Sequence, residues 1–252
     1  LFEISGIKLE DWKPKKLRLF LSGDFSASSD LYFLLRHHLK KIGIKADGAS
    51  EECFLSPDHL KPVGFDLDQE LIPYPTQSFP GYRVIQEYFI LPEKFLFLDL
   101  TGWEKWRDRE DAARFAVRFE LTDPPFRPTR LRGDNFVLSA TPAINIFPHE
   151  ADPIRLDHRK TEYPVRPSGT EPSHYQVYSI EKVVGYTHGT AQEREYSSFD
   201  LFTPETESGP VYHVSLKSSP VRAETSFYLS VAYPKEYGTP ISETLSIDVL
   251  CT

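Results

Sequence analysis

Hydrophobic and polar residues alternate with a period of two along several stretches of the chain, which predicts β-strands. The clearest stretches are 16–22, where three leucines share one side, and 115–121. Residues 95–100 are apolar enough to fit a strand buried on both faces. The other expected strands are 136–141, 175–180, 183–187, 211–216, 227–233 and 245–251. Turn-rich stretches separate the last three, which favours an antiparallel meander.

Two stretches have the spacing of helices instead. The first is expected near 28–42, with Gly43 at the position that follows a helix end. The second is expected near 82–91, after Pro80 and before Pro92. Its packing face should consist of four apolar residues, Val84, Ile85, Tyr88 and Phe89. We therefore expect Phe89 to lie in the core together with Phe95 and Phe97.

Proline and aromatic residues are both frequent, with 21 Pro, 18 Phe, 13 Tyr and 3 Trp among 252 residues. Prolines divide a chain into short elements and long loops, and aromatic residues suit half-buried strands. The predicted fold class is α+β and β-rich, with mostly antiparallel, sandwich-like sheets, two main helices and long Pro-rich loops. The prolines at 124, 125 and 128 suggest a boundary between an α+β domain (1–125) and a mainly antiparallel β domain (126–252).

The net charge, the lengths of the apolar runs and the numbers of Cys and Met bear on which classes of protein remain possible. The net charge is −8, the opposite of what a general nucleic-acid binder needs. No apolar run approaches the roughly 18 residues of a membrane helix, so we expect no membrane insertion. Cys53 and Cys251 are too few and too far apart for a disulfide framework. The chain contains no Met and does not begin with one, so we expect a fragment of a longer protein or a sequence that lacks its Met positions.

The densest group of titratable residues is at 149–162, with two His and four carboxylates. A metal site or a hydrolase that uses Asp152 or Asp157 is one interpretation. Basic residues interleave with the carboxylates, however, and would lower their pKa values. We therefore predict a structural ion-pair cluster of Asp152, Arg155, Asp157 and His158. No catalytic residue, cofactor or metal ligand is predicted.

A carbohydrate-binding β module is a further alternative, because exposed tryptophans can stack on sugars. The candidates are Trp12, Trp103 and Trp106. The last two lie in a charged segment that fits a solvated helical turn equally well.

Four segments resemble one family in their order along the chain. They are LIPYP followed by FPGYRVIQEYFILPEKFLFLDL (71–100), TPAINIF (141–147), ADPIRLDH followed by TEY (151–163), and YQVYSIEKV (175–183). Together they resemble the TssF family, also called VasA or ImpG, of type VI secretion baseplate subunits. Ile90 and Leu91 replace the Ala-Phe usual in the family. The helix-to-strand signature comprises Tyr82, Arg83, Glu87, Tyr88, Pro92, Glu93 and Lys94.

The resemblance implies a structural role without catalysis. Members of the family form a baseplate wedge with TssG, usually with a second TssF copy, and are joined by TssK and TssE. The wedges surround the spike hub and support sheath assembly. The resemblance also implies a cytoplasmic bacterial protein that docks at the inner-membrane secretion complex.

Overall fold

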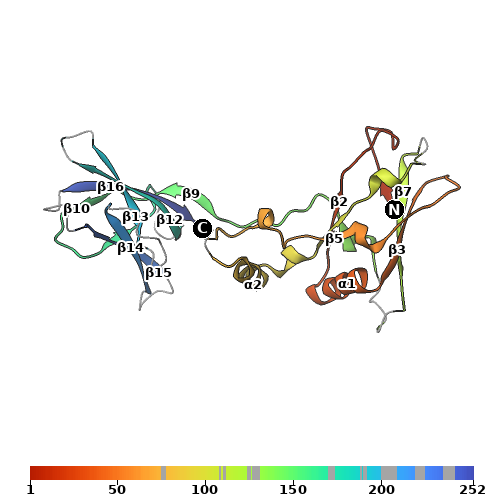
Figure 1. Ribbon diagram of the computed structural model, residues 1–252, viewed down its shortest axis with the longest axis horizontal. Coiled ribbons are helices and arrows are strands. Elements are labelled where there is room, and N and C mark those ends of the chain that lie inside the picture. Colours follow the sequence, from red (N-terminus) through yellow and green to blue (C-terminus); the bar gives the residue numbers. More distant parts are fainter. Residues whose placement is uncertain are drawn as a thin grey trace. The chain divides into compact units, whose positions relative to one another are not determined.

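The computed structural model describes all residues except 75–77, 108, 110–111, 124–125, 127–130, 170–173, 188, 190–191, 200–208, 219–224 and 235–241. The described chain divides into two compact units, Leu1–Ile144 and Asn145–Thr252 (Figure 1). No described helix has the length and hydropathy of a membrane span.

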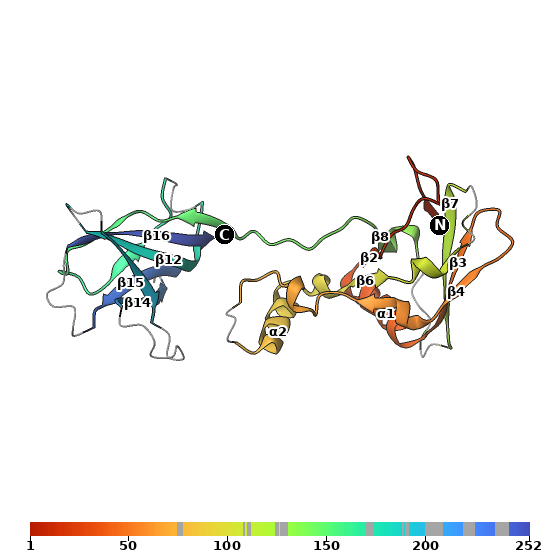
Figure 2. The same cartoon turned by 45° about the horizontal axis from the view of Figure 1, so that its top comes forward.

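The first unit contains two helices, two four-stranded sheets and short 3-10 helices within the described residues. Its elements are β1 (Phe2–Glu3), β2 (Leu17–Leu21), α1 (Phe25–His37), β3 (Leu39–Ala46), β4 (Cys53–Leu55), η1 (Pro57–His59), β5 (Leu60–Pro62), η2 (Leu67–Gln69), α2 (Pro80–Ile90), η3 (Pro92–Phe95), β6 (Phe97–Leu100), η4 (Trp103–Lys105), β7 (Arg114–Leu121), η5 (Gly133–Asn135) and β8 (Phe136–Val137). One sheet has the strand order β1-β7-β3-β4 and the other β5-β6-β2-β8. All their strand pairs are antiparallel (Figure 2).

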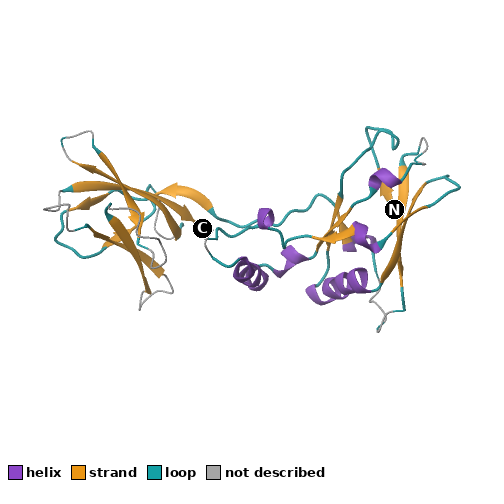
Figure 3. Cartoon of the chain, in the orientation of Figure 1, coloured by secondary structure: helices purple, strands orange, loops and turns teal. Residues whose placement is uncertain are grey.

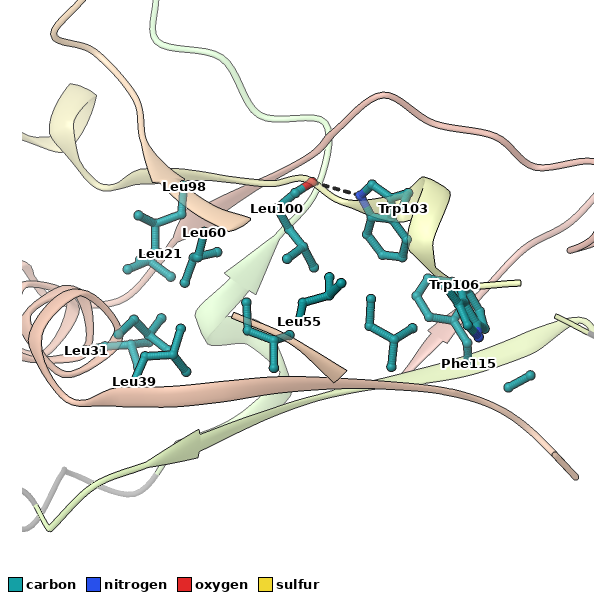
Figure 4. Close-up of a cluster of buried hydrophobic side chains, with 14 of the residues drawn as sticks. Leu21, Leu31, Leu39, Leu55, Leu60, Leu98, Leu100, Trp103, Trp106 and Phe115 are labelled. Atoms are coloured by element: carbon teal, nitrogen blue, oxygen red, sulfur yellow. Dashed lines mark hydrogen bonds between the residues drawn. The ribbon is translucent and has the colours of Figure 1, made fainter. Parts of the chain in front are cut away.

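The core of this unit lies between the two sheets and α1 (Figure 4). Alternation along the strands explains it, because the leucines of β2 and the isoleucines of β3 point inward. All four residues of β6 are buried, as expected for a strand covered on both faces, and its one charged residue, Asp99, accepts hydrogen bonds from Lys16 and Arg18. Trp103 lies fully within the core, and its Nε1–H donates to the carbonyl of Leu100 at 2.8 Å.

Helix α1 begins and ends earlier than the predicted 28–42. Asp24 caps it by accepting hydrogen bonds from the backbone N–H groups of Ser26 and Ala27. The helix ends at His37 because β3 follows at once and pairs with both β4 and β7. Gly43 is therefore a strand residue, not a helix stop. Leu39, Ile42 and Ile44 are buried along β3, and the first two also fit helical spacing, which explains the error.

The second unit consists only of strands and loops in its described part (Figure 3). Its strands are β9 (Phe147–Glu150), β10 (Ile154–Leu156), β11 (Tyr163–Val165), β12 (Val177–Thr187), β13 (Glu193–Ser198), β14 (Val211–Ser218), β15 (Thr225–Ala232) and β16 (Glu243–Cys251). They form one sheet in the order β10-β16-β12-β13-β14-β15-β11, with β9 also pairing with β16. The β13–β14 pair is parallel and the others are antiparallel.

The predicted meander is wrong in its last step. β14 and β15 pair as expected, but β16 pairs with β12, β9 and β10. Strands 175–180 and 183–187 are one strand, β12, with register shifts on either side of Ile180. The expected class, β-rich α+β with two helices and mostly antiparallel sheets, is confirmed.

The proposed proline boundary lies largely outside the described residues, since 124, 125 and 128 are not described. Contacts divide the chain later, between Ile144 and Asn145. The cause is β8, which pairs with β2 and so holds this part of the chain in the first unit. The side chain of Asn135 adds a hydrogen bond to the Ser22 carbonyl at 2.9 Å.

Candidate protein-interaction surface

Helix α2 and the 3-10 helix η3 contain the residues that carry the helix-to-strand signature, and the structure divides them into two groups. Arg83, Glu87 and Lys94 point inward and are 1%, 1% and 2% exposed. Tyr82, Tyr88 and Glu93 are exposed, and Pro92 is half-buried. The helix therefore has charged residues on its inner face. We call Arg83, Glu87 and Lys94 the buried charge triad.

Glu87 is the centre of the triad. Its Oε1 accepts hydrogen bonds from the backbone N–H groups of Leu71 at 2.7 Å and Ile72 at 3.2 Å. Its Oε2 accepts a hydrogen bond from Lys94 and lies 4.0 Å from Arg83 Nη1. One carboxylate thus joins the helix to the segment before it and to the turn after it.

Arg83 also binds the segment that precedes α2, at residues 65 and 66. Its Nη2 donates to the carbonyls of Asp66 at 3.1 Å and, more weakly, Phe65 at 3.4 Å. Its Nε and Nη1 have no hydrogen-bond partner in the described structure, although Nη1 is near the Glu87 carboxylate.

The pKa of Glu87 shows which interaction dominates. Burial alone would raise it, because a carboxylate loses hydration in the interior. The hydrogen bonds from Lys94, Leu71 and Ile72 outweigh burial and hold the pKa of Glu87 below its ordinary value. Glu87 is therefore ionised in the fold near neutral pH.

The outer face of α2 is apolar and exposed. Phe89 is 79% exposed, and Tyr82, Ile85, Tyr88 and Ile90 are each about half exposed or more. The prediction that Phe89 and its neighbours form a packing face in the core is wrong, because the triad occupies the inner positions of the helix. Phe95 and Phe97 are buried, as predicted.

An apolar groove lies between α1 and α2. Its volume is about 440 Å³. The residues that line it come from both helices and from the segments beside them: Phe25, Ser29, Tyr32, Phe65, Val84, Ile85, Tyr88, Phe89, Pro92, Phe95 and Leu96. Exposed apolar patches of this kind on a folded protein mark interaction sites.

Four acidic residues are next in sequence to residues that line the groove. Asp24, Asp30, Asp66 and Glu93 are exposed, and each is adjacent to a residue that lines the groove. The basic residues of α2 and η3, Arg83 and Lys94, are both buried. The exposed charge contributed by these two elements is therefore negative.

The structural ion-pair cluster of Asp152, Arg155, Asp157 and His158 stays a prediction, and all four residues are exposed. Asp157 accepts hydrogen bonds from the Arg159 N–H at 3.1 Å and the Tyr163 hydroxyl at 3.0 Å. These two bonds lower the pKa of Asp157. The ring of His158 packs edge-on against Tyr233 at 5.7 Å.

The geometry does not support the hydrolase, the carbohydrate-binding module or the metal site. A carboxylic acid catalyst in a hydrolase needs a raised pKa, whereas that of Asp157 is lowered. Trp103 and Trp106 are buried and Trp12 packs edge-on against Trp103 at 5.1 Å, so the tryptophans form core rather than a sugar platform. The described residues contain no group of His, Cys, Asp or Glu suited to a metal ion.

One buried polar network was not predicted. Glu243 is fully buried and accepts hydrogen bonds from Tyr196 at 2.6 Å and Thr187 at 3.3 Å, and it pairs with Arg194 at 3.0 Å. Burial, with the hydrogen bonds to Glu243 and Tyr233, raises the pKa of Tyr196. A signal was present in the alternation of β16, because Glu243 shares the inward side of Leu245 and Ile247.

Three comparisons with known proteins agree. The model of the family described as "Type VI secretion system, TssF" matches residues 1–252. Type VI secretion system component TssF1 of Pseudomonas aeruginosa is 30% identical over 197 residues, which are 77% of this chain and 31% of that protein.

A solved chain from the TssK-TssF-TssG baseplate subcomplex of the type VI secretion system is similar over 94% of this chain and 43% of its own length, with 25% identity and a TM-score of 0.74. The chain thus spans less than half the length of these relatives. The match over the whole of its own length shows that the chain belongs to the TssF family of the type VI secretion system.

Proposed function

We propose that this chain is part of a structural subunit of the type VI secretion baseplate, which acts by holding other proteins rather than by catalysis. The observation that carries the proposal is the similarity over 94% of the chain to a solved component of the TssK-TssF-TssG subcomplex. TssG and TssK are accordingly the first partners to test. TssE, a second copy of the subunit and the spike hub are further partners implied by the sequence resemblance, as is a cytoplasmic location at the inner-membrane secretion complex.

The surface of the first unit fits this role. Partner-binding surfaces combine exposed aromatic anchors with a polar rim. The outer face of α2 has such anchors in Tyr82, Tyr88 and Phe89, and exposed acidic residues are next in sequence to residues of the groove beside it. The buried charge triad keeps that face turned outward, because it occupies the inward positions of the same helix.

Co-purification of the full-length protein with each partner tests the proposal. A tagged full-length chain is expressed with TssG and TssK together, and separately with each. We expect a stable complex with both present, and loss of sheath assembly in cells that lack the full-length protein. Normal sheaths in those cells, or a tagged chain that elutes alone, would contradict the scaffold role.

A further inference from the structure

We propose that the groove between α1 and α2 holds a helical segment of a partner protein, in which apolar side chains are flanked by Lys and Arg. The proposal rests on the scaffold role proposed above and specifies the chemistry of one contact. Its basis is the combination of an aromatic groove with an acidic rim and with charges buried on the opposite side of α2.

The apolar part of the groove selects apolar anchors. Aromatic and aliphatic side chains from two helices line it, and the deepest contributions come from Phe95 and Leu96, which are buried. On the open side, Ile85 projects from one turn of α2, and the adjacent Tyr88 and Phe89 project from the next. A groove between helices with anchors at this spacing suits an amphipathic helix, whose own anchors recur every three or four residues.

The exposed charged residues near the groove determine which charge a partner segment should have. Asp24, Asp30, Asp66 and Glu93 are exposed, and each is next in sequence to a residue that lines the groove. Arg36, one turn after Tyr32 on α1, is an exposed basic residue whose Nη1 donates to the Leu60 carbonyl at 2.6 Å. The four acidic residues outnumber it. Lys and Arg on the partner would therefore meet complementary charge, which favours association and fixes orientation.

The same charges argue against a second copy of this chain at this surface. In a two-fold symmetric contact the same patch meets itself. Acidic rims would then face one another across the contact, and the chain has a net charge of −8. Like charges across an interface are unfavourable.

The test uses two synthetic peptides with the same Leu and Phe anchors on about five helical turns. One peptide has Lys at all polar positions and the other has Glu. Each is labelled and titrated with the full-length protein by fluorescence anisotropy, at low and at moderate salt. We expect the Lys peptide to bind about tenfold more tightly than the Glu peptide, and its advantage to fall as salt rises.

Variants of the full-length protein locate the contact. Phe89→Ser should weaken binding of the Lys peptide by about tenfold or more, as expected for a central aromatic anchor. The matched control is Phe54→Ser, since Phe54 is an exposed phenylalanine on β4 that does not line the groove. The double change Asp30→Lys with Glu93→Lys should shift the preference toward the Glu peptide.

Three results would overturn the proposal: equal binding of both peptides, equal loss in Phe89→Ser and Phe54→Ser, or a wild-type dimer that Phe89→Ser dissociates. Failure here is separable from failure of the scaffold role. Co-purification of wild-type protein with TssG and TssK reports the scaffold role whichever peptide binds. Unfolding of each variant is followed by tryptophan fluorescence, so that loss of fold is not mistaken for loss of binding.

Discussion

Replacement of Glu87 by Gln tests the buried charge triad directly. The change retains an oxygen that can accept from the Leu71 and Ile72 N–H groups, and removes the negative charge that faces Lys94. Lys94 would then be a 2% exposed ammonium group without a counter-ion. Removal of one partner of a buried ion pair costs about 3–5 kcal/mol. That is a large part of the 5–15 kcal/mol typical of a domain, so unfolding should begin at clearly lower denaturant.

The assay can report on the first unit alone. Residues 1–252 contain three tryptophans, at 12, 103 and 106, and in a protein of these residues all three belong to the first unit. Denaturant unfolding followed by tryptophan fluorescence therefore gives the free energy of unfolding of this unit. The matched control is Glu93→Gln, an exposed glutamate one residue from Lys94, which should change that free energy by less than about 0.5 kcal/mol.

A double variant distinguishes the cost of leaving Lys94 without a counter-ion from the cost of losing the Glu87–Lys94 hydrogen bond. In Glu87→Gln with Lys94→Met, both charges of that pair are removed, Arg83 is the one charge of the triad that remains, and the Met chain fills similar space. This double variant should be more stable than Glu87→Gln alone, because an uncompensated buried ammonium is the main cost. A Glu87→Gln protein as stable as wild type, or a double variant that loses the sum of both single effects, would refute the reasoning.

The pH dependence has a definite sign. The pKa of Glu87 is lowered in the fold from an ordinary value of 4.5. Its contribution to stability is therefore fully present above about pH 4.5 and disappears as the pH falls through the lowered folded value. The stability difference between wild type and Glu87→Gln should be constant near neutral pH and shrink in acid. A difference that grows on acidification would mean that the pKa is raised instead.

The remaining predictions concern single side chains. Phe97→Ala should destabilise the first unit by about 3–5 kcal/mol, whereas Phe89→Ala should change it by less than about 0.5 kcal/mol, measured by the same fluorescence assay, because only Phe97 is buried. Gly185→Ala should destabilise the second unit by about 1–3 kcal/mol in calorimetry, since the added Cβ would lie 2.5 Å from Glu243 Oε2 and 2.8 Å from Tyr196 Cε2. Asp157→Ala should leave the melting temperature of that unit as close to wild type as Asp152→Ala does, and a selective drop would show that the Tyr163 hydrogen bond matters more than its exposure suggests.

Alternation of apolar residues predicted the strands that face a core on one side. β2, β7, β14 and β15 were all expected within a few residues, because inward and outward positions differ clearly in polarity. β13 was missed for the opposite reason. Its sequence, EREYSS, has one buried residue, Tyr196, and it is placed by pairing with β12 and β14. Pairing partners distant in sequence are not visible in a local pattern.

The end of α1 shows where two patterns conflict. Leu39 and Ile42 continue the helical spacing of α1, yet both also lie on the inward side of β3. Pairing of β3 with two neighbouring strands decides the outcome, since an eight-residue central strand gains hydrogen bonds on both edges. Tertiary pairing overrides the local propensity here.

The error at α2 has a different origin, because the helix itself was predicted within two residues at each end. A hydrophobic pattern shows which residues share a face, and the period is the same whether that face meets a core or another protein. The inner face was the less apolar one, with Arg83 and Glu87 one turn apart and Lys94 beyond the helix. Because these charges, not the aromatic side chains, join α2 to the preceding segment, the aromatic face is free to move from water to a partner without loss of the contacts that hold the helix. A surface stabilised in this way can bind and release without unfolding, which suits a subunit whose proposed role is to assemble with others.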